Sequence, residues 1–203
     1  MSRSLVRLPR QFRPVVPAPI GPAVADGPVR RRFPRRAILR TAAALVVLFI
    51  LFIGATLAII VFPPTDRPAR ANAILMLGGA GDRRDRALEL ARAGYAPVLA
   101  LSTPNARHCP TVPNVKVICF RPDPFTTQGE AREAGRLAAR YGWTRMIFVT
   151  DRSQNVRARL RIDRCYAGKK IMVSVDPPFR DWPYLIAYQW SAMFKALIWQ
   201  RSC

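Results

Sequence analysis

The sequence has few acidic residues and a single histidine, and both shortages limit its chemistry. Its 12 Asp and Glu residues stand against 33 Lys and Arg, which gives a net charge of +21 over 203 residues. The one histidine, His108, has no Cys-x-x-Cys pair near it to complete a zinc site. It also has no nucleophile and acid arranged as a catalytic triad. We therefore expect no metal site, and we interpret His108 as structural or exposed in its Cys-Pro loop.

No RNA- or DNA-binding motif accompanies the positive charge. Residues 1–40 contain ten Arg and one acid, Asp26, and the part after Phe62 has a net charge of +12. The charge is thus spread along the chain, with one cluster directly before an apolar run. Anionic lipid attracts such a cluster by roughly 1 kcal/mol per Arg. The pattern favours a membrane surface as partner and predicts no nucleic-acid partner.

Cysteine is absent from the first half of the chain. All four cysteines follow the apolar run, at Cys109, Cys119, Cys165 and Cys203. An even number of cysteines in an exported domain is typical of disulfides. Three pairings are open, and four free thiols are the alternative. In one pairing, a Cys109–Cys119 disulfide closes a Pro-containing loop. A Cys165–Cys203 disulfide then ties the last helix to the rest of the domain.

Residues 42–62 carry no charge, and Thr56 is their only polar side chain. A helix of this length spans roughly 30 Å, the thickness of a bilayer core. The arginines just before it predict a cytoplasmic N-terminus by the positive-inside rule. We expect a single-pass plasma-membrane protein with a disordered basic tail at 1–41, a linker at 63–70 and an extracytoplasmic domain at 71–203. A cleaved signal peptide is the alternative, but the small-x-small sequence Ala69-Arg70-Ala71 lies well beyond the apolar run.

The remaining chain alternates short apolar runs with helical patterns. Ala73–Leu77 is a strand that ends at a glycine turn, and a helix capped by Asp82 follows from Arg83 to about Ala93. The later strands are predicted at 97–101, 115–120, 146–150 and 171–175, and the later helices at 128–141, after Asp151, and at 182–199. The last helix carries Ile186, Trp190, Phe194 and Leu197 at helical spacing. The alternation predicts an α/β domain with a Rossmann-like parallel sheet and helices on both faces.

Ligands of such sheets bind beyond the carboxyl ends of the strands. Three loops meet there, at 78–82, 124–130 and 150–154. A glycine turn before a helix start favours an anionic ligand, and Arg side chains bind phosphate bidentately. The alternative is a tight turn without ligand, because the full dinucleotide spacing and a P-loop Lys are both absent. The candidate ligand-binding residues are Gly78, Gly79, Gly81, Asp82, Arg83, Thr126, Thr127, Thr150, Gln154 and Arg157.

Glu130 is the one candidate catalytic residue, and it has two interpretations. In Thr127-Gln-Gly-Glu130 it has capping-box spacing, so its carboxylate would bond the start of its own helix. Alternatively it acts as a general base or holds a metal. The sequence specifies neither a cofactor nor an oligomeric state.

Three segments together resemble the YdcF/SanA/ElyC-like family, the domain of unknown function 218. They are Ala73-Ile-Leu-Met-Leu-Gly-Gly with the following Arg83-x-x-Arg-Ala-Leu-Glu-Leu-Ala, then Pro124-Phe-Thr-Thr-Gln-Gly-Glu-Ala131, and Phe148-Val-Thr150 with Arg157-Ala158. The resemblance covers roughly residues 71–175. It implies a Rossmann-like domain, often membrane-anchored, in bacteria. It also implies a pocket lined by Gly78, Gly79, Arg83, Thr127, Glu130, Thr150 and Arg157.

The chain departs from the family at several pocket positions. Ser102-Thr103-Pro104 stands where the family has Ser-Gly-Gly, and Asp151 and Gln154 stand where it has Ser and His. Gln189 stands where the last helix of the family often carries Glu. A Gln does not take up a proton as His does near neutral pH. These departures favour a weakened enzyme or a protein that only binds.

The expected function is that of an envelope protein binding a phosphorylated precursor of peptidoglycan or lipid-carrier metabolism, which the resemblance implies. A non-catalytic envelope scaffold or degenerate family member is the first alternative. A nucleotide or S-adenosylmethionine binder is the second, and it rests on the fold alone.

Overall fold

The computed structural model describes residues 35–203 except Ala80 and His108. Residues 1–34 of the disordered tail expected at 1–41 lie outside these residues, and so does the interpretation of His108. The chain divides into two units, residues 1–42 and 43–203. The second unit contains the sheet and the candidate site.

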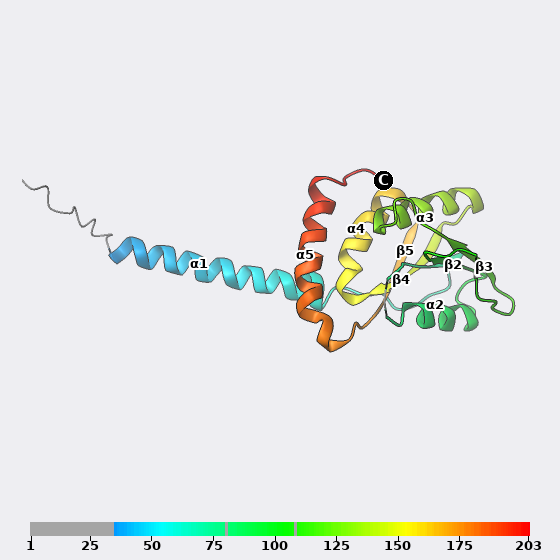
Figure 1. The fold of residues 1–203 in the computed structure, drawn as a ribbon, viewed down its shortest axis with the longest axis horizontal. Coiled ribbons are helices and arrows are strands. Elements are labelled where there is room, and N and C mark those ends of the chain that lie inside the picture. Colours follow the sequence, from blue (N-terminus) through cyan, green and yellow to red (C-terminus); the bar gives the residue numbers. More distant parts are fainter. Residues whose placement is uncertain (1–34, 80, 108) are drawn as a thin grey trace, which may run out of the picture. The chain divides into compact units, whose positions relative to one another are not determined.

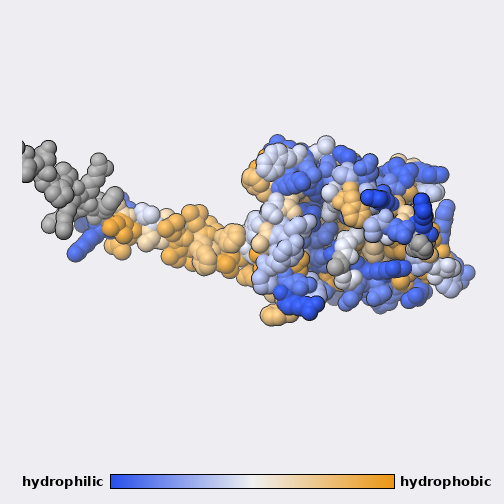
Figure 2. Space-filling view, in the orientation of Figure 1, coloured by the Kyte–Doolittle hydropathy of each residue, from blue (hydrophilic) through white to orange (hydrophobic). Residues whose placement is uncertain are grey.

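Helix α1 (Arg35–Thr56) continues into a π-helical turn, η1 (Leu57–Val61), as one apolar helix. Its 27 residues are long and apolar enough to cross a membrane (orange helix in Figure 2). Residues 35–41 were expected in the disordered tail, and that expectation is wrong, because the helix begins at Arg35. Pro34 is the last proline before Pro63, and the Arg, Ala and Leu residues between Pro34 and Ala42 are strong helix formers.

Five strands form one parallel sheet in the order β3-β2-β1-β4-β5, which confirms the expected fold class (Figure 1). Strand β1 is fully buried and occupies the centre, with Ile74 opposite Leu99 of β2 and Ile147 of β4. The strands are β1 (Ala73–Met76), β2 (Val98–Ser102), β3 (Lys116–Phe120), β4 (Arg145–Asp151) and β5 (Lys169–Val175).

Helices cover both faces of this sheet. On one face α2 (Arg83–Arg92) buries Ala87, Leu88, Leu90 and Ala91. On the other, α3 (Thr127–Tyr141) buries Ala131, Ala134, Leu137 and Ala138, and α4 (Asn155–Cys165) packs beside it through Ala158 and Ile162. Both helices lie in the ranges that the sequence predicted. Gly94 follows α2 with a φ of 76°, as expected of a helix-ending glycine.

The order of the strands places a crevice at the centre of the sheet. From β1 the chain crosses to β2 through α2 on one face, and α3 later brings it back to β4 on the other side of β1. At such a switch point the loops after neighbouring strands separate and leave room for a ligand. The loops after β1 and β4 are two of the three that we predicted to meet.

Helix α5 (Trp182–Ile198), preceded by the short turn η3 (Phe179–Asp181), has the predicted helical periodicity but a different buried side. The apolar stripe with Phe194 and Leu197 is not packed into the α/β core, because both residues are exposed. The two buried residues of α5 are Gln189 and Ala196. The helix therefore turns a polar residue inward, which a search for apolar periodicity does not predict.

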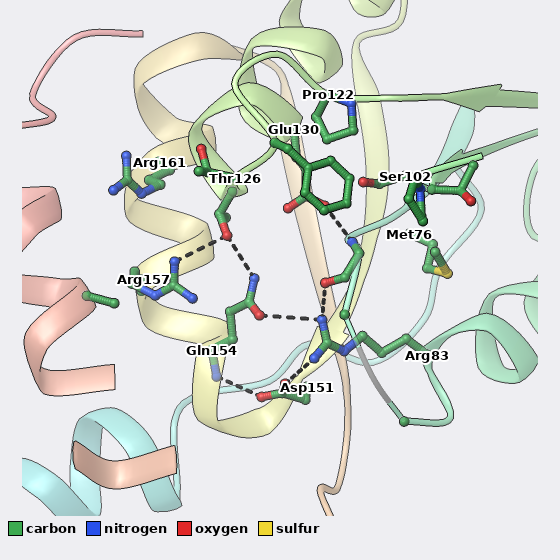
Figure 3. Close-up of a pocket in the computed structure, with 18 of the residues that line it drawn as sticks. Met76, Arg83, Ser102, Pro122, Thr126, Glu130, Asp151, Gln154, Arg157 and Arg161 are labelled. Carbon is green, nitrogen blue, oxygen red and sulfur yellow. Dashed lines mark hydrogen bonds and ion pairs between the residues drawn. The ribbon is translucent and has the colours of Figure 1, made fainter. Parts of the chain in front are cut away.

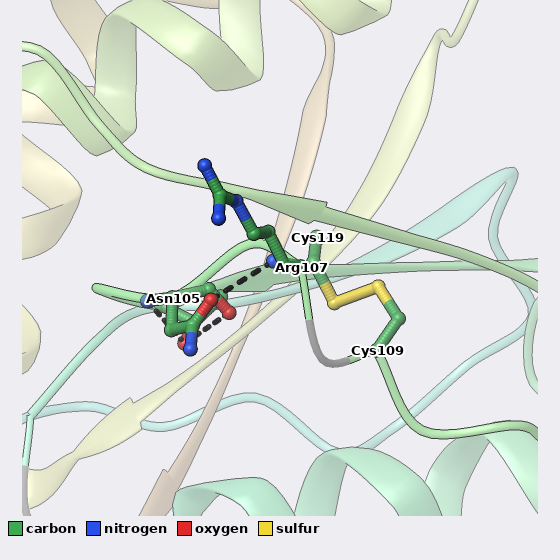
Figure 4. Close-up of a disulfide and its surroundings, with 5 residues drawn as sticks. Asn105, Arg107, Cys109 and Cys119 are labelled. Atoms are coloured by element: carbon green, nitrogen blue, oxygen red, sulfur yellow. Dashed lines mark hydrogen bonds between the residues drawn. A yellow bond between two sulfur atoms is a disulfide. The ribbon is translucent and has the colours of Figure 1, made fainter.

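Both disulfides of the proposed pairing are present. Cys109–Cys119 ties the loop after β2 to strand β3 (Figure 4). Cys165–Cys203 joins the end of α4 to the segment after α5. That segment is also held by Arg164, which donates to the Ala196 carbonyl at 2.9 Å and to the carbonyl of Gln200. The second disulfide thus fastens the segment after α5 to the end of α4.

We predict that the Cys165→Ser/Cys203→Ser double variant loses about 4 kcal/mol of unfolding free energy. The bond closes a loop with a sequence separation of 38 residues, and the restriction of the unfolded chain grows with loop length. Urea unfolding of the variant and the oxidised wild type measures the loss. The matched Cys109→Ser/Cys119→Ser variant, with a separation of 10 residues, should lose about 3 kcal/mol. A negligible loss in the first variant would contradict this stabilising role.

Candidate functional site

A cavity of about 610 Å³ lies at the carboxyl ends of the strands, between the three predicted loops and α5 (Figure 3). Its size is within the range of small-molecule sites, about 300–1,000 Å³. Most of the predicted site residues line it: Gly78, Gly79, Gly81, Arg83, Thr126, Thr127, Glu130, Gln154 and Arg157. The structure does not bring Asp82 or Thr150 to its wall. Asp82 is exposed and makes no side-chain cap, and Thr150 is fully buried within β4.

Arg83 lines the cavity and is held by groups at the ends of two strands. Its Nη2 forms a buried ion pair with Asp151 at the end of β4, and its Nη1 donates to the Gly78 carbonyl after β1. Nη1 also lies 3.4 Å from the Gln154 Oε1. The Arg83 charge is therefore matched by Asp151, and this pair joins the two loops of the crevice.

Gly79 makes that position of Arg83 possible. Its φ of +131° is a conformation that side chains rarely adopt, and a Cβ there would lie 2.4 Å from Arg83 Nη1. Gly78 is also confined, since a Cβ on it would meet Glu130 Oε1 at 3.0 Å and Ser102 Oγ at 3.1 Å. The glycine turn is thus packed by protein side chains. Both glycines nevertheless line the cavity, so their backbone borders the space in which a ligand would lie.

Glu130 does not cap its own helix, so the capping-box interpretation is wrong. Thr126 is the N-cap residue, and the Glu130 carboxylate instead accepts from the N–H of Gly78 in the loop after β1. Burial raises the pKa of Glu130, while the hydrogen bonds from Ser102 and Gly78 and the charges of Arg83 and Arg157 oppose the rise. A carboxyl with a raised pKa that faces a cavity can serve as a proton donor or acceptor for a ligand bound there.

Arg157 on α4 is buried with only neutral hydrogen-bond partners. Its Nε donates to Gln189 Oε1 at 2.8 Å, and its Nη1 donates to Thr127 Oγ1 at 3.2 Å. Gln154 donates to the same Thr127 oxygen at 3.1 Å. Burial lowers the pKa of Arg157, and Tyr188, Asp151 and Glu130 counteract the shift. No carboxylate forms an ion pair with it among the residues that the structure describes.

Arg161 is a second buried arginine on the cavity wall, one helical turn after Arg157. Its Nη2 donates to Gln200 Oε1, while Nε and Nη1 have no hydrogen-bond partner in the described chain. Burial, with repulsion from Arg157 and Arg164, lowers the pKa of Arg161 to about 10. It therefore stays charged at neutral pH. We did not predict this residue, although the i, i+4 spacing of Arg157 and Arg161 would have placed both on one side of a helix.

The cavity wall formed by α5 was also missed, except for Gln189. Tyr184, Tyr188 and Lys195 line the cavity from this helix, and the two tyrosine rings stack with centroids 5.9 Å apart. Gln189 bridges the wall, accepting from Arg157 and donating to Ser153 Oγ at 3.2 Å. These residues come from an element whose periodicity suggested only packing, so sequence spacing gave no signal for them.

The charges of the cavity decide what it can bind. Three buried guanidinium groups line the cavity with one paired carboxylate, Asp151, and one carboxyl whose pKa is raised, Glu130. A buried charge is stable when it is paired and hydrogen-bonded, and two of these arginines have no charged partner. The arrangement therefore suits an anion. No group of three potential metal ligands is found among the described residues.

Comparison with known proteins leaves the family open. No protein-family model matches the chain, and no curated protein matches it either.

We predict that Gly79→Ala lowers the unfolding free energy more than Gly81→Ala does. Both residues have positive φ, at 131° and 95°, so each alanine carries backbone strain of about 1–3 kcal/mol. Only at Gly79 does the added Cβ also displace Arg83 from Asp151, because nothing lies within 4 Å of a Cβ at Gly81. Chemical denaturation of both variants measures the difference. Equal losses would contradict the proposed packing of Arg83 on Gly79.

We predict that Glu130→Gln becomes more stable relative to the wild type as the pH rises. The raised pKa means that the folded chain holds the proton above 4.5, where the unfolded chain has lost it. Between those two pKa values the stability of the wild type falls with increasing pH, and it levels off above the folded pKa. The glutamine removes this titration and retains an oxygen for the Gly78 N–H.

Urea unfolding from about pH 4 to pH 8 measures this effect. Glu89→Gln, on the exposed side of α2, is the matched control for the loss of one carboxylate. A difference between Glu130→Gln and the wild type that stays constant, or moves in favour of the wild type, would show that burial does not raise the pKa of Glu130.

Proposed function

We propose that this protein is a single-pass membrane protein of the bacterial cell envelope that binds a phosphorylated precursor. In this proposal α1 is an uncleaved anchor in the plasma membrane, with the N-terminus in the cytoplasm and the α/β domain outside. The ligand belongs to peptidoglycan or lipid-carrier metabolism, as the resemblance to the YdcF-like family implies. The two disulfides support the oxidising side of the membrane.

The observation that carries the binding proposal is the charge of Arg157 and Arg161. Both are buried on the cavity wall, and their partners are the neutral side chains of Gln189, Thr127 and Gln200. A phosphate group brings the negative charge that these arginines lack, and it accepts the N–H groups of Arg161 that have no partner in the described chain. Glu130 stands in the same cavity as a proton donor or acceptor for any reaction of that phosphate.

The second candidate is a scaffold or degenerate family member that binds without catalysis. Gln154 and Gln189 favour it, because both are amides hydrogen-bonded within the cavity at positions where the resemblance implies His and Glu. An amide there holds the arginines in place but transfers no proton. Binding with no turnover, and no gain of activity in Gln154→His, is the result expected of this candidate.

We predict that Arg161→Gln weakens the binding of a polyprenyl phosphate by about 10-fold or more. Loss of a charge-assisted hydrogen bond costs about 1.5–3 kcal/mol, and each 1.4 kcal/mol is tenfold in affinity. Isothermal titration of the full chain in detergent with farnesyl phosphate measures the affinity, and inorganic pyrophosphate and nucleotides are tested in parallel.

Two controls make this test specific. Arg136→Gln removes an arginine from the exposed side of α3, where it pairs with Glu133, and it should bind as the wild type does. Farnesol has the same chain without the phosphate and should not bind. Equal affinity of Arg161→Gln and the wild type, or binding of farnesol as tight as that of its phosphate, would overturn the proposal.

A further inference from the structure

Helix α5 has two sides with different surroundings. One side lines the cavity through Tyr184, Tyr188, Gln189 and Lys195. The other carries Trp190, with Phe194 and Leu197 four and seven residues later and therefore on the same side of the helix. The second side is the apolar stripe that the sequence shows, and it takes no part in the α/β core.

Trp190 joins this second side to the membrane-length helix α1. Its ring stacks on Phe52 with centroids 5.4 Å apart, and its Nε1–H donates to Thr56 Oγ1 at 3.0 Å. Thr56 is buried, whereas the apolar side chains of α1 before it are exposed (Figure 2). Helix α5 thus contacts the apolar helix in its last turns, before Pro63 and Pro64 end the apolar run (Figure 1).

Beyond this contact α5 exposes a continuous set of large apolar side chains. Phe194 is 55% exposed and Trp199 72% exposed, and their rings pack edge to face at 5.6 Å. Leu197 and Ile198 are also exposed between them. We call Phe194, Leu197, Ile198 and Trp199 the α5 apolar surface. An exposed apolar patch of this kind marks a contact with a partner or a membrane.

We infer that the α5 apolar surface lies in the headgroup boundary of the bilayer that α1 crosses. The inference rests on the proposed membrane anchoring of α1. Trp190 touches α1 at Phe52 and Thr56, and Thr56 and Ile60 are buried, so insertion of α1 places α5 beside the carboxyl-terminal half of the apolar helix, on the side where that helix leaves the hydrocarbon. Trp and Tyr rings prefer this level, and an amphipathic helix lies in it with its apolar side down.

The positive charges at the two ends of α5 also favour contact with the bilayer surface. Arg180 precedes the helix, and Lys195 and Arg201 stand at its end, all three exposed. Basic residues next to an apolar helix side are attracted by anionic lipid headgroups. Since the opposite side of α5 lines the cavity, its tyrosines and Lys195 bring the cavity next to the bilayer surface. A lipid-linked phosphate therefore reaches the arginines with its hydrocarbon tail still in the membrane.

Quenching of tryptophan fluorescence by brominated lipid tests this inference on the full chain. The protein is placed in nanodiscs made with or without dibrominated phosphatidylcholine, and the fluorescence lost to bromine is recorded. Trp199→Phe should lose the part of this quenching that Trp199 contributes. Trp143→Phe removes a buried tryptophan after α3 and should leave the quenched fluorescence unchanged. Leu197→Trp in the Trp199→Phe background should restore quenching from the same surface.

The possible results separate this inference from the proposals on which it rests. Protein that does not co-elute with nanodiscs would show that α1 is no anchor. Co-elution with equal quenched fluorescence in Trp199→Phe and the wild type would overturn the inference and leave the anchor intact. That result is also expected if a second copy of the chain covers the surface, because bound protein shields Trp199 from bromine. Binding of farnesyl phosphate in detergent is independent of all these outcomes.

Discussion

The buried positive charge of the cavity is the constraint on which the rest of the site depends. The charge of Arg83 is neutralised within the protein by Asp151, and this ion pair joins the loops after β1 and β4. Arg157 and Arg161 are instead surrounded by hydroxyl and amide groups, which orient them without neutralising them. A fold tolerates such groups when a ligand supplies the missing charge, because an unpaired buried charge costs several kcal/mol. The same two arginines therefore affect both the stability of the folded domain and its affinity for an anion.

The parallel sheet provides only half of this cavity, and α5 with the segment after it provides the rest. Gln189 and Gln200 reach Arg157 and Arg161 from that side, and the Cys165–Cys203 disulfide fastens it to α4. The same helix contacts α1 through Trp190. Helix α5 thus forms one wall of the site, and a disulfide holds the segment that follows it. The same helix connects the domain to α1, the proposed anchor. This arrangement explains how a short domain forms a cavity of about 610 Å³ on a five-stranded sheet.

Sequence periodicity predicted the strands, the helices α2 and α3 and the edge where the loops meet, because each depends on local apolar spacing. It failed where a distant partner decides the outcome. Glu130 has capping-box spacing, yet it bonds the N–H of Gly78, 52 residues away. Arg161 resembles any surface arginine until the segment around Gln200 covers it. The start of α1 at Arg35 was not predicted. The disordered tail expected from the proline-rich sequence was drawn to residue 41, although its last proline is Pro34.

The most direct test of the central claim is a crystal structure of the full chain grown with pyrophosphate. The account predicts phosphate oxygens within hydrogen-bonding distance of both Arg157 and Arg161, with Arg83 still paired to Asp151. It is contradicted if the cavity holds no anion at saturating pyrophosphate, or if carboxylates of the chain itself occupy the positions beside Arg157 and Arg161.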